Sequence, residues 1–191
     1  LYVLSMRVLY GRHYASRYEE IAALIPEGAS VLELCCGPAQ LYRQYLRRKK
    51  VDYTGLDVNG RFIKQLQNEN VDGRVWDLRE NNQLPSADYV LMQASLYHFL
   101  PDTRPIMDRM LEAARRKVII AEPIRNLSSS SFAVVRSIAR YLTKVGGENH
   151  ERFTEQMLDQ FFSSYQPQIE RCFLIPGGRE KVYVLSPQRS T

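Results

Sequence analysis

The segment Val31–Ala39 constrains the fold of this chain more than any other part of the sequence. A short apolar run that carries one acid, Glu33, leads into a Gly-Pro corner at Gly37, and a second apolar run ends in Asp57. In parallel α/β sheets, a tight first strand-to-helix turn lets a ligand approach the backbone. An acid at the tip of the second strand then accepts the hydroxyls of a ribose. The segment therefore predicts a nucleoside site at the carboxyl edge of a parallel sheet.

Length and composition are those of an ordinary soluble domain. The 191 residues are 45% hydrophobic and 25% charged, and a chain of this size buries about 70% of its unfolded surface, so we expect one domain over residues 1–191. Three cysteines without a disulfide framework or a C-x-x-C spacing favour a reducing cytoplasm and no metal site. No apolar run reaches the roughly 18 residues of a membrane span. The net charge of +5 permits an acidic partner without requiring one.

Apolar, β-rich runs alternate with segments of helical period, which is typical of a parallel sheet covered on both faces. Only Pro176–Arg179 separates the last two runs, and this turn is too short for a crossover helix, so they must form an antiparallel hairpin. We predict an α/β fold: a doubly wound, mostly parallel, seven-stranded Rossmann-like sheet that ends in an antiparallel hairpin, with helices on both faces. The first helical segment is expected over Gln40–Lys50. The expected strands are Ser30–Leu34, Asp52–Asp57, Gly73–Asp77, Ala87–Gln93, Lys117–Glu122, Gln168–Ile175 and Lys181–Leu185.

With these motifs the chain resembles the class I S-adenosylmethionine-dependent methyltransferases, from about Tyr10 to Ser186. The family's first motif, an acid followed by alternating glycines, corresponds to Val31–Ala39. Gly55–Val58, Val75–Leu78 and Ala87–Phe99 correspond to its second, third and fourth motifs, in the same order. The resemblance implies S-adenosylmethionine as the cofactor and S-adenosylhomocysteine as its product.

The resemblance also assigns cofactor contacts to residues at the strand ends. It implies that Glu33 anchors the local turn and the methionine amino group, that Asp57 binds the ribose diol, and that Asp77 meets the adenine amino group. Cys35 and Gly37 would present backbone to the cofactor, and Leu78 would meet the adenine ring. The cofactor-binding residues that it implies are Tyr14, Glu33, Cys35, Gly37, Asp57, Val58, Asp77, Leu78, Gln93 and Ala94.

Two positions of the first motif depart from the family pattern. Cys35 and Ala39 stand where the family usually has glycines, and a Cβ atom there narrows the approach to the backbone. A Rossmann-like globule without a nucleotide therefore stays open as an alternative. A nicotinamide enzyme is disfavoured because Leu34–Ala39 cannot supply the glycines of G-x-G-x-x-G.

Two side chains are candidates for a catalytic role. Methyl transfer from a sulfonium is an in-line displacement, and holding the reactants in line is worth about 7–11 kcal/mol at best. A base is needed only when the acceptor must lose a proton. His98 follows the fourth expected strand and is either a general base or a structural hydrogen-bonding residue. Glu122 ends the fifth strand and either orients a substrate cation or hydroxyl or caps the following loop.

Two helical additions are expected around the sheet. Tyr10, Tyr14 and Tyr18 recur every four residues within an N-terminal helical cap, about 1–28, where they pack into the core or, for Tyr14, reach the cofactor. Arg12 is a candidate partner for the methionine carboxylate. A helical lid insert is expected at about 123–150. Its amphipathic segment Phe132–Val145 has a basic face that suits solvent, a substrate lid or a membrane surface.

The acceptor is expected to be a small molecule, methylated on O, N or C. Family members that methylate a flipped base usually carry an Asn/Asp-Pro-Pro-aromatic segment after the fourth strand, whereas this chain has Gln93–Leu96 there. His150 lies in a loop and is either solvated or a substrate contact. No nucleic-acid partner and no stable membrane association are expected. The alternatives are a non-catalytic S-adenosylmethionine-binding or partner-binding module of the same fold, and a peripheral lipid-modifying methyltransferase.

Overall fold

The computed structural model describes residues 11–124 and 152–187. Tyr10, His150 and nearly all of the expected lid, including Phe132–Val145, lie outside the described residues.

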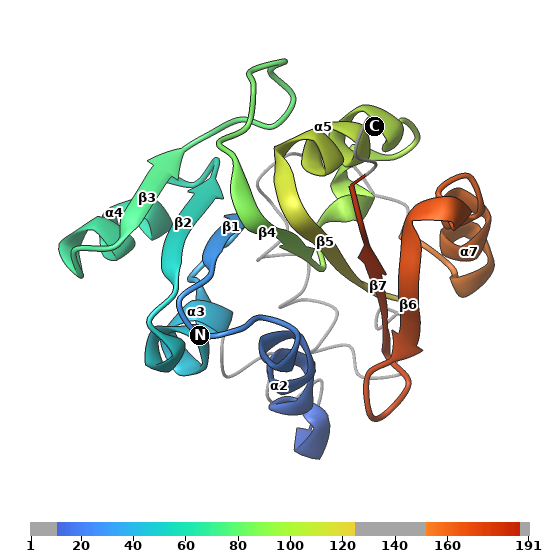
Figure 1. The fold of residues 1–191 in the computed structure, drawn as a ribbon, viewed down its shortest axis with the longest axis horizontal. Helices are drawn as coiled ribbons and strands as arrows, with labels where there is room; N and C mark the ends of the chain where they lie inside the picture. Colours follow the sequence, from blue (N-terminus) through green and yellow to red (C-terminus); the bar gives the residue numbers. More distant parts are fainter. Residues whose placement is uncertain (1–10, 125–151, 188–191) are drawn as a thin grey trace, which may run out of the picture.

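The centre of the fold is a seven-stranded sheet in the order β3-β2-β1-β4-β5-β7-β6, which fans across Figure 1 from β3 to β6. All neighbouring strands pair in parallel except β7, which is antiparallel to both β5 and β6. The predicted doubly wound sheet with a terminal antiparallel hairpin is therefore confirmed. The strands are β1 Ser30–Leu34, β2 Asp52–Asp57, β3 Asp72–Val75, β4 Ala87–Gln93, β5 Ala114–Pro123, β6 Ile169–Leu174 and β7 Glu180–Leu185.

Helices α4 and α7 begin at a polar side chain that satisfies one of the first backbone N–H groups. The Asn59 side chain accepts from Arg61 N (3.0 Å) at the start of α4, and the Thr154 hydroxyl accepts from Met157 N (3.2 Å) at the start of α7. The α-helices are α2 Ser16–Ala23, α3 Gln40–Gln44, α4 Gly60–Asn68, α5 Arg104–Ala113 and α7 Glu155–Ser163. Short 3-10 helices are η1 Gly11–His13, η2 Leu46–Lys49, η3 Leu96–Phe99 and η5 Gln166–Gln168.

The expected continuous helix over Gln40–Lys50 was wrong. The backbone breaks at Tyr45 (φ −127°, ψ −50°), which separates α3 from η2. Leu41 and Leu46 are both fully buried, yet five residues of an unbroken α-helix would point them about 140° apart. The break therefore lets both side chains enter the same core.

Two apolar cores cover the two faces of the sheet. The first contains buried side chains of α5 and α7, and the second contains those of α2, α3 and α4. Alternation along the strands divides their residues between the cores: Val118 and Ile120 of β5 belong to the first, and Ile119 and Ala121 to the second. Helices therefore lie on both faces, as predicted.

Helix α2 is fixed to the sheet by a buried ion pair. Arg17 Nη2 lies 2.7 Å from Glu180 Oε1, and both side chains are at most 3% exposed. Gln93 Nε2, at the end of β4, donates to Arg17 O (3.4 Å), so α2 lies against the carboxyl ends of the central strands (Figure 1). In the part of the chain that the structure describes, no helix has the length and apolar composition that a bilayer crossing requires.

Candidate functional site

The turn after β1 has an alternating left-handed backbone. Cys35, Gly37 and Ala39 have φ values of 52°, 51° and 49°. Left-handed φ is uncommon for a residue with a Cβ atom, so the turn keeps a glycine-like conformation at two positions that carry other residues. Apart from Gly37 and its two chain neighbours, no atom of the described residues lies within 4 Å of the point where a Cβ would stand on Gly37. A ligand therefore has room to approach the backbone of Gly37.

Asp57 holds this turn at the tip of β2. Its Oδ2 accepts from Gly37 N (2.8 Å), and its Oδ1 accepts from Asn59 N (2.7 Å). Each carboxylate oxygen has a second lone pair, so Asp57 can accept further hydrogen bonds from hydroxyl groups. Glu33 is expected to anchor the turn; in the structure its Oε2 binds the Tyr53 hydroxyl, and the carboxylate that binds the Gly37 amide is that of Asp57.

Glu33 lies beneath the turn, 4% exposed, and its Oε2 accepts from the Tyr53 hydroxyl (2.6 Å). Burial raises the pKa of Glu33 to about 7; the Tyr53 hydrogen bond opposes this shift and the Asp57 charge adds to it. Gly55 pairs with Glu33 in the sheet, and a Cβ there would stand 2.9 Å from Cys36 Sγ and 3.1 Å from the Tyr53 hydroxyl oxygen. Sequence reasoning missed Tyr53, whose only signal is its position two residues before that glycine.

An apolar surface borders the ends of β2 and β3. Val58 and Val75 are 58% and 61% exposed, unusually high for large apolar side chains, and Leu78 is buried at 6% exposure. Half-buried Asp77 accepts at Oδ1 from Arg79 N (2.9 Å). Exposed apolar side chains beside a carboxylate suit a flat heteroaromatic ring with an amino group. From the sequence we assigned no cofactor contact to Val75, although Val75 begins the segment that corresponds to the third motif.

The end of β4 carries a further left-handed residue, Ala94 (φ 50°), whose N–H donates to Ala121 O (2.7 Å). His98 follows in η3, half-buried, with its ring centroid 4.0 Å from that of Tyr97. The Arg152 guanidinium lies 4.6 Å from the centroid of the same tyrosine ring. The structure thus places His98 in an aromatic and cationic cluster one turn beyond the sheet edge.

Glu122 is buried at the end of β5 and caps the start of η3. Its Oε1 accepts from Ser95 N (2.6 Å) and Leu96 N (2.5 Å), whereas its Oε2 has no hydrogen-bond partner among the described residues. Burial raises the pKa of Glu122 to about 8, the two backbone bonds oppose this shift, and Glu180 adds to it. The raised pKa favours the protonated carboxyl, and Oε2 is the oxygen that no donor of the described residues faces.

The Cys35 thiol lies in an acidic environment. Burial raises the pKa of Cys35 to about 12, and the charges of Asp57 and Asp77 add to this shift. The thiol therefore stays protonated, and the surrounding field is negative. Such a field favours a ligand that carries a positive centre.

The expected contacts from the N-terminal segment lie beside the strand ends. Tyr14 is 6% exposed and packs edge-on against Tyr18, with ring centroids 5.4 Å apart. It lies between η1 and α2, so it does not share one continuous helix with Tyr18. Arg12 Nε donates to His13 Nε2 (3.1 Å). The structure brings the strand-end residues together, from Glu33 through Glu122, and packs Tyr14 into the second core.

Residues 15–137, more than half of the chain, match the family described as methionine biosynthesis protein MetW. A comparison with curated protein sequences found no match.

Solved structures resemble the whole fold. A TehB-like SAM-dependent methyltransferase from Corynebacterium glutamicum is 16% identical, with a TM-score of 0.61 over 91% of this chain and 88% of that chain. Magnesium protoporphyrin IX methyltransferase (ChlM) from Synechocystis PCC 6803, solved with bound SAH, is 13% identical, with a TM-score of 0.66 over 96% and 93%. The 16S rRNA methylase ArmA is 18% identical, with a TM-score of 0.59 over 95% and 89%. These similarities confirm the class I methyltransferase fold.

Proposed function

Because the chain belongs to the MetW family, we propose that it is an enzyme that binds S-adenosylmethionine across the ends of β1–β4 and transfers its methyl group to a small-molecule acceptor. The observation that carries this proposal is the Asp57 carboxylate, which holds the Gly37 amide at 2.8 Å while keeping lone pairs for a ribose diol. The solved neighbours with bound SAM or SAH support the same cofactor.

The residues of the site fit this cofactor from end to end. Open space at Gly37 admits it to the backbone, and Asp77, Leu78 and the exposed Val58 offer a carboxylate and an apolar surface to the adenine. Glu33 supplies a buried carboxyl near the expected methionine amino group. Gln93 and Ala94 line the remaining side, and Tyr14 closes it from the N-terminal segment.

The bound cofactor supplies an electrophilic methyl group, and the residues of the site align the acceptor with it and provide a negative electrostatic field. Carboxylates around Cys35 stabilise a positive centre while the acceptor is aligned. His98 is the proposed base for an acceptor that must lose a proton, because it lies half-buried in η3, directly after the carboxyl end of β4. Glu122 orients the acceptor, and it becomes a base only when pH exceeds its raised pKa of about 8.

A small-molecule acceptor is the better supported choice. Gln93–Leu96 after β4 offers no Asn/Asp-Pro-Pro-aromatic platform for a flipped base, and the family name refers to methionine biosynthesis. The solved neighbours act on different acceptors, a porphyrin and an rRNA among them. We place the enzyme in the cytoplasm, where its free cysteines Cys35, Cys36 and Cys172 stay reduced.

Titration calorimetry with S-adenosylmethionine tests the proposal. We expect saturable binding that is competed by S-adenosylhomocysteine. Asp57→Ala should weaken binding at least tenfold, because a buried ribose loses a charged acceptor, whereas the exposed acid Asp72, whose Oδ1 and Oδ2 bind Arg74, serves as a control through Asp72→Ala. No binding at millimolar ligand would refute the proposal. Binding without methyl transfer to any small molecule would instead support a non-catalytic module.

A further inference from the structure

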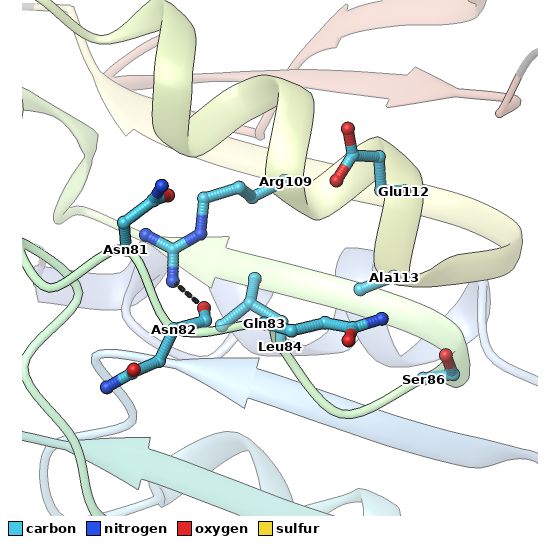
Figure 2. A pocket seen from close by; sticks show the side chains of 8 residues that line it. All are labelled: Asn81, Asn82, Gln83, Leu84, Ser86, Arg109, Glu112 and Ala113. Carbon is cyan, nitrogen blue, oxygen red and sulfur yellow. Dashed lines mark hydrogen bonds between the residues drawn. The ribbon is translucent and has the colours of Figure 1, made fainter.

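Helix α5 carries one cation that reaches across to the loop between β3 and β4. Arg109 Nη1 donates to Leu78 O (2.9 Å), and Nη2 donates to Asn82 O (2.5 Å); Figure 2 draws the second bond. Arg109 Nε is buried without a hydrogen-bond partner in the described part of the chain. The guanidinium therefore lies against the loop, where its planar fork joins two carbonyl groups that are four residues apart.

The loop has few other attachments. Leu78 and Leu84 enter the first core at 6% and 4% exposure, and the five residues between them are all exposed. An open surface pocket of about 290 Å³ lies beside this stretch (Figure 2), lined by Asn81, Asn82, Gln83, Leu84, Ser86, Arg109, Glu112 and Ala113. Because residues 79–83 are exposed, the two hydrogen bonds from Arg109 are a large share of what fixes the loop.

The same loop sets the carboxylate at the end of β3. Asp77 Oδ1 accepts from Arg79 N (2.9 Å), and Asp77 O accepts from Glu80 N (3.2 Å). Leu78, whose carbonyl accepts from Arg109, lies in the chain between Asp77 and the two residues whose N–H groups donate to Asp77. A shift of the Leu78 peptide would therefore turn the Asp77 side chain.

We propose that Arg109 is a positioning residue for the purine end of the nucleoside site: from α5 it holds the backbone of residues 78–82 so that Asp77 and Leu78 keep the arrangement that receives the base. This inference rests on the proposed function. Arg109 acts only through the loop and contacts neither the cofactor nor the acceptor.

The experiment compares Arg109→Met with Arg115→Met. Arg115, at the start of β5, also donates to this connection, at Ser86 O (3.3 Å), and pairs with Asp88 at 3.0 Å. Arg115→Met thus removes a guanidinium from the far end of the same loop and serves as the control. Arg109→Lys is a third variant, which keeps the charge but loses the planar fork.

Two readouts are needed. We expect amide hydrogen exchange of Arg79 and Glu80, whose N–H groups bind Asp77, to accelerate in Arg109→Met, while exchange of the Gly37 amide, which is held by Asp57, stays as in the wild type. In calorimetry we expect about tenfold weaker S-adenosylmethionine binding for Arg109→Met, an intermediate loss for Arg109→Lys, and no change for Arg115→Met.

Combination with Asp77→Asn separates positioning from general destabilisation. If Arg109 acts through Asp77, the double variant binds about as weakly as the weaker single variant, whereas two independent losses would multiply. Unchanged exchange of the Arg79 and Glu80 amides, unchanged affinity in Arg109→Met, or multiplying losses would each overturn the role of Arg109. Wild-type protein that binds no S-adenosylmethionine in the same titration would refute the proposed function, and the purine role with it, whatever the exchange data show.

Discussion

At Cys35, a glycine substitution will give a more stable protein than an alanine substitution. Both remove the thiol, so the comparison isolates the left-handed backbone (φ 52°). The alanine Cβ costs about 1–2 kcal/mol in that conformation, whereas glycine loses about 0.5–1 kcal/mol through the greater freedom of the unfolded chain. The expected difference is therefore about 0.5–1 kcal/mol in favour of Cys35→Gly.

Urea unfolding at equilibrium measures this difference as a shift of the midpoint at constant slope. The matched control is Ala22→Gly within α2, where ordinary helical backbone predicts a loss of about 1 kcal/mol. Replacing alanine by glycine should therefore raise the free energy of unfolding at position 35 and lower it at position 22. If Cys35→Ala equals or exceeds Cys35→Gly in stability, the strain argument for the first turn is refuted. S-adenosylmethionine should also bind Cys35→Gly at least as tightly as Cys35→Ala, because no Cβ narrows the approach.

Three further predictions test the site and its supports. Asp57→Asn should weaken S-adenosylmethionine binding about tenfold in calorimetry, since an amide NH₂ would face one of two backbone donors; equal affinity would contradict the placement of the ribose. Burial raises the pKa of Glu33 from 4.5 to about 7 and that of Glu122 to about 8, so the folded state holds protons that the unfolded state has lost in this window. The free energy of unfolding should therefore fall as pH rises from about 5 to 8, by up to about 1.4 kcal/mol per pH unit for each carboxyl. Glu122→Gln should flatten the upper part of that profile in thermal melts, and an unchanged slope would speak against the burial argument. Gly55→Ala should cost about 1–3 kcal/mol by overpacking, since its Cβ would stand 2.9 Å from the nearest sulfur, while Gly60→Ala, with its nearest contact at 3.7 Å, should be nearly neutral in the same urea titration.

The sheet could be predicted because its signals are local. Alternating apolar runs identified β1, β2 and β4 with their observed bounds, and the short Pro176–Arg179 turn required the antiparallel hairpin. The break at Tyr45 could not be predicted, since it depends on two leucines that enter one core from incompatible helical positions. Hydrophobic periodicity describes a single helix or strand, whereas this break results from the packing of α3 and η2 against the same core.

The strand-end positions of the site were also predictable, but the partners of its side chains were not. Motif order placed Glu33 and Asp57 at neighbouring strand ends, yet which carboxylate holds the turn depends on where Tyr53 points. Arg109 was not singled out either, because a helix residue that binds backbone carbonyls leaves no pattern in the sequence.

The buried pair of Arg17 and Glu180 has a consequence for how the molecule is assembled. The first α-helix of the described residues pairs through Arg17 with Glu180 of β7, which follows every other described strand in the chain. Until β7 has been synthesised this ion pair cannot form, and burial of a charge without its partner costs several kcal/mol. The segment expected to close over the methyl donor should therefore dock only after β7 has been synthesised, so the nascent chain gains its nucleoside site late relative to the strands that carry it.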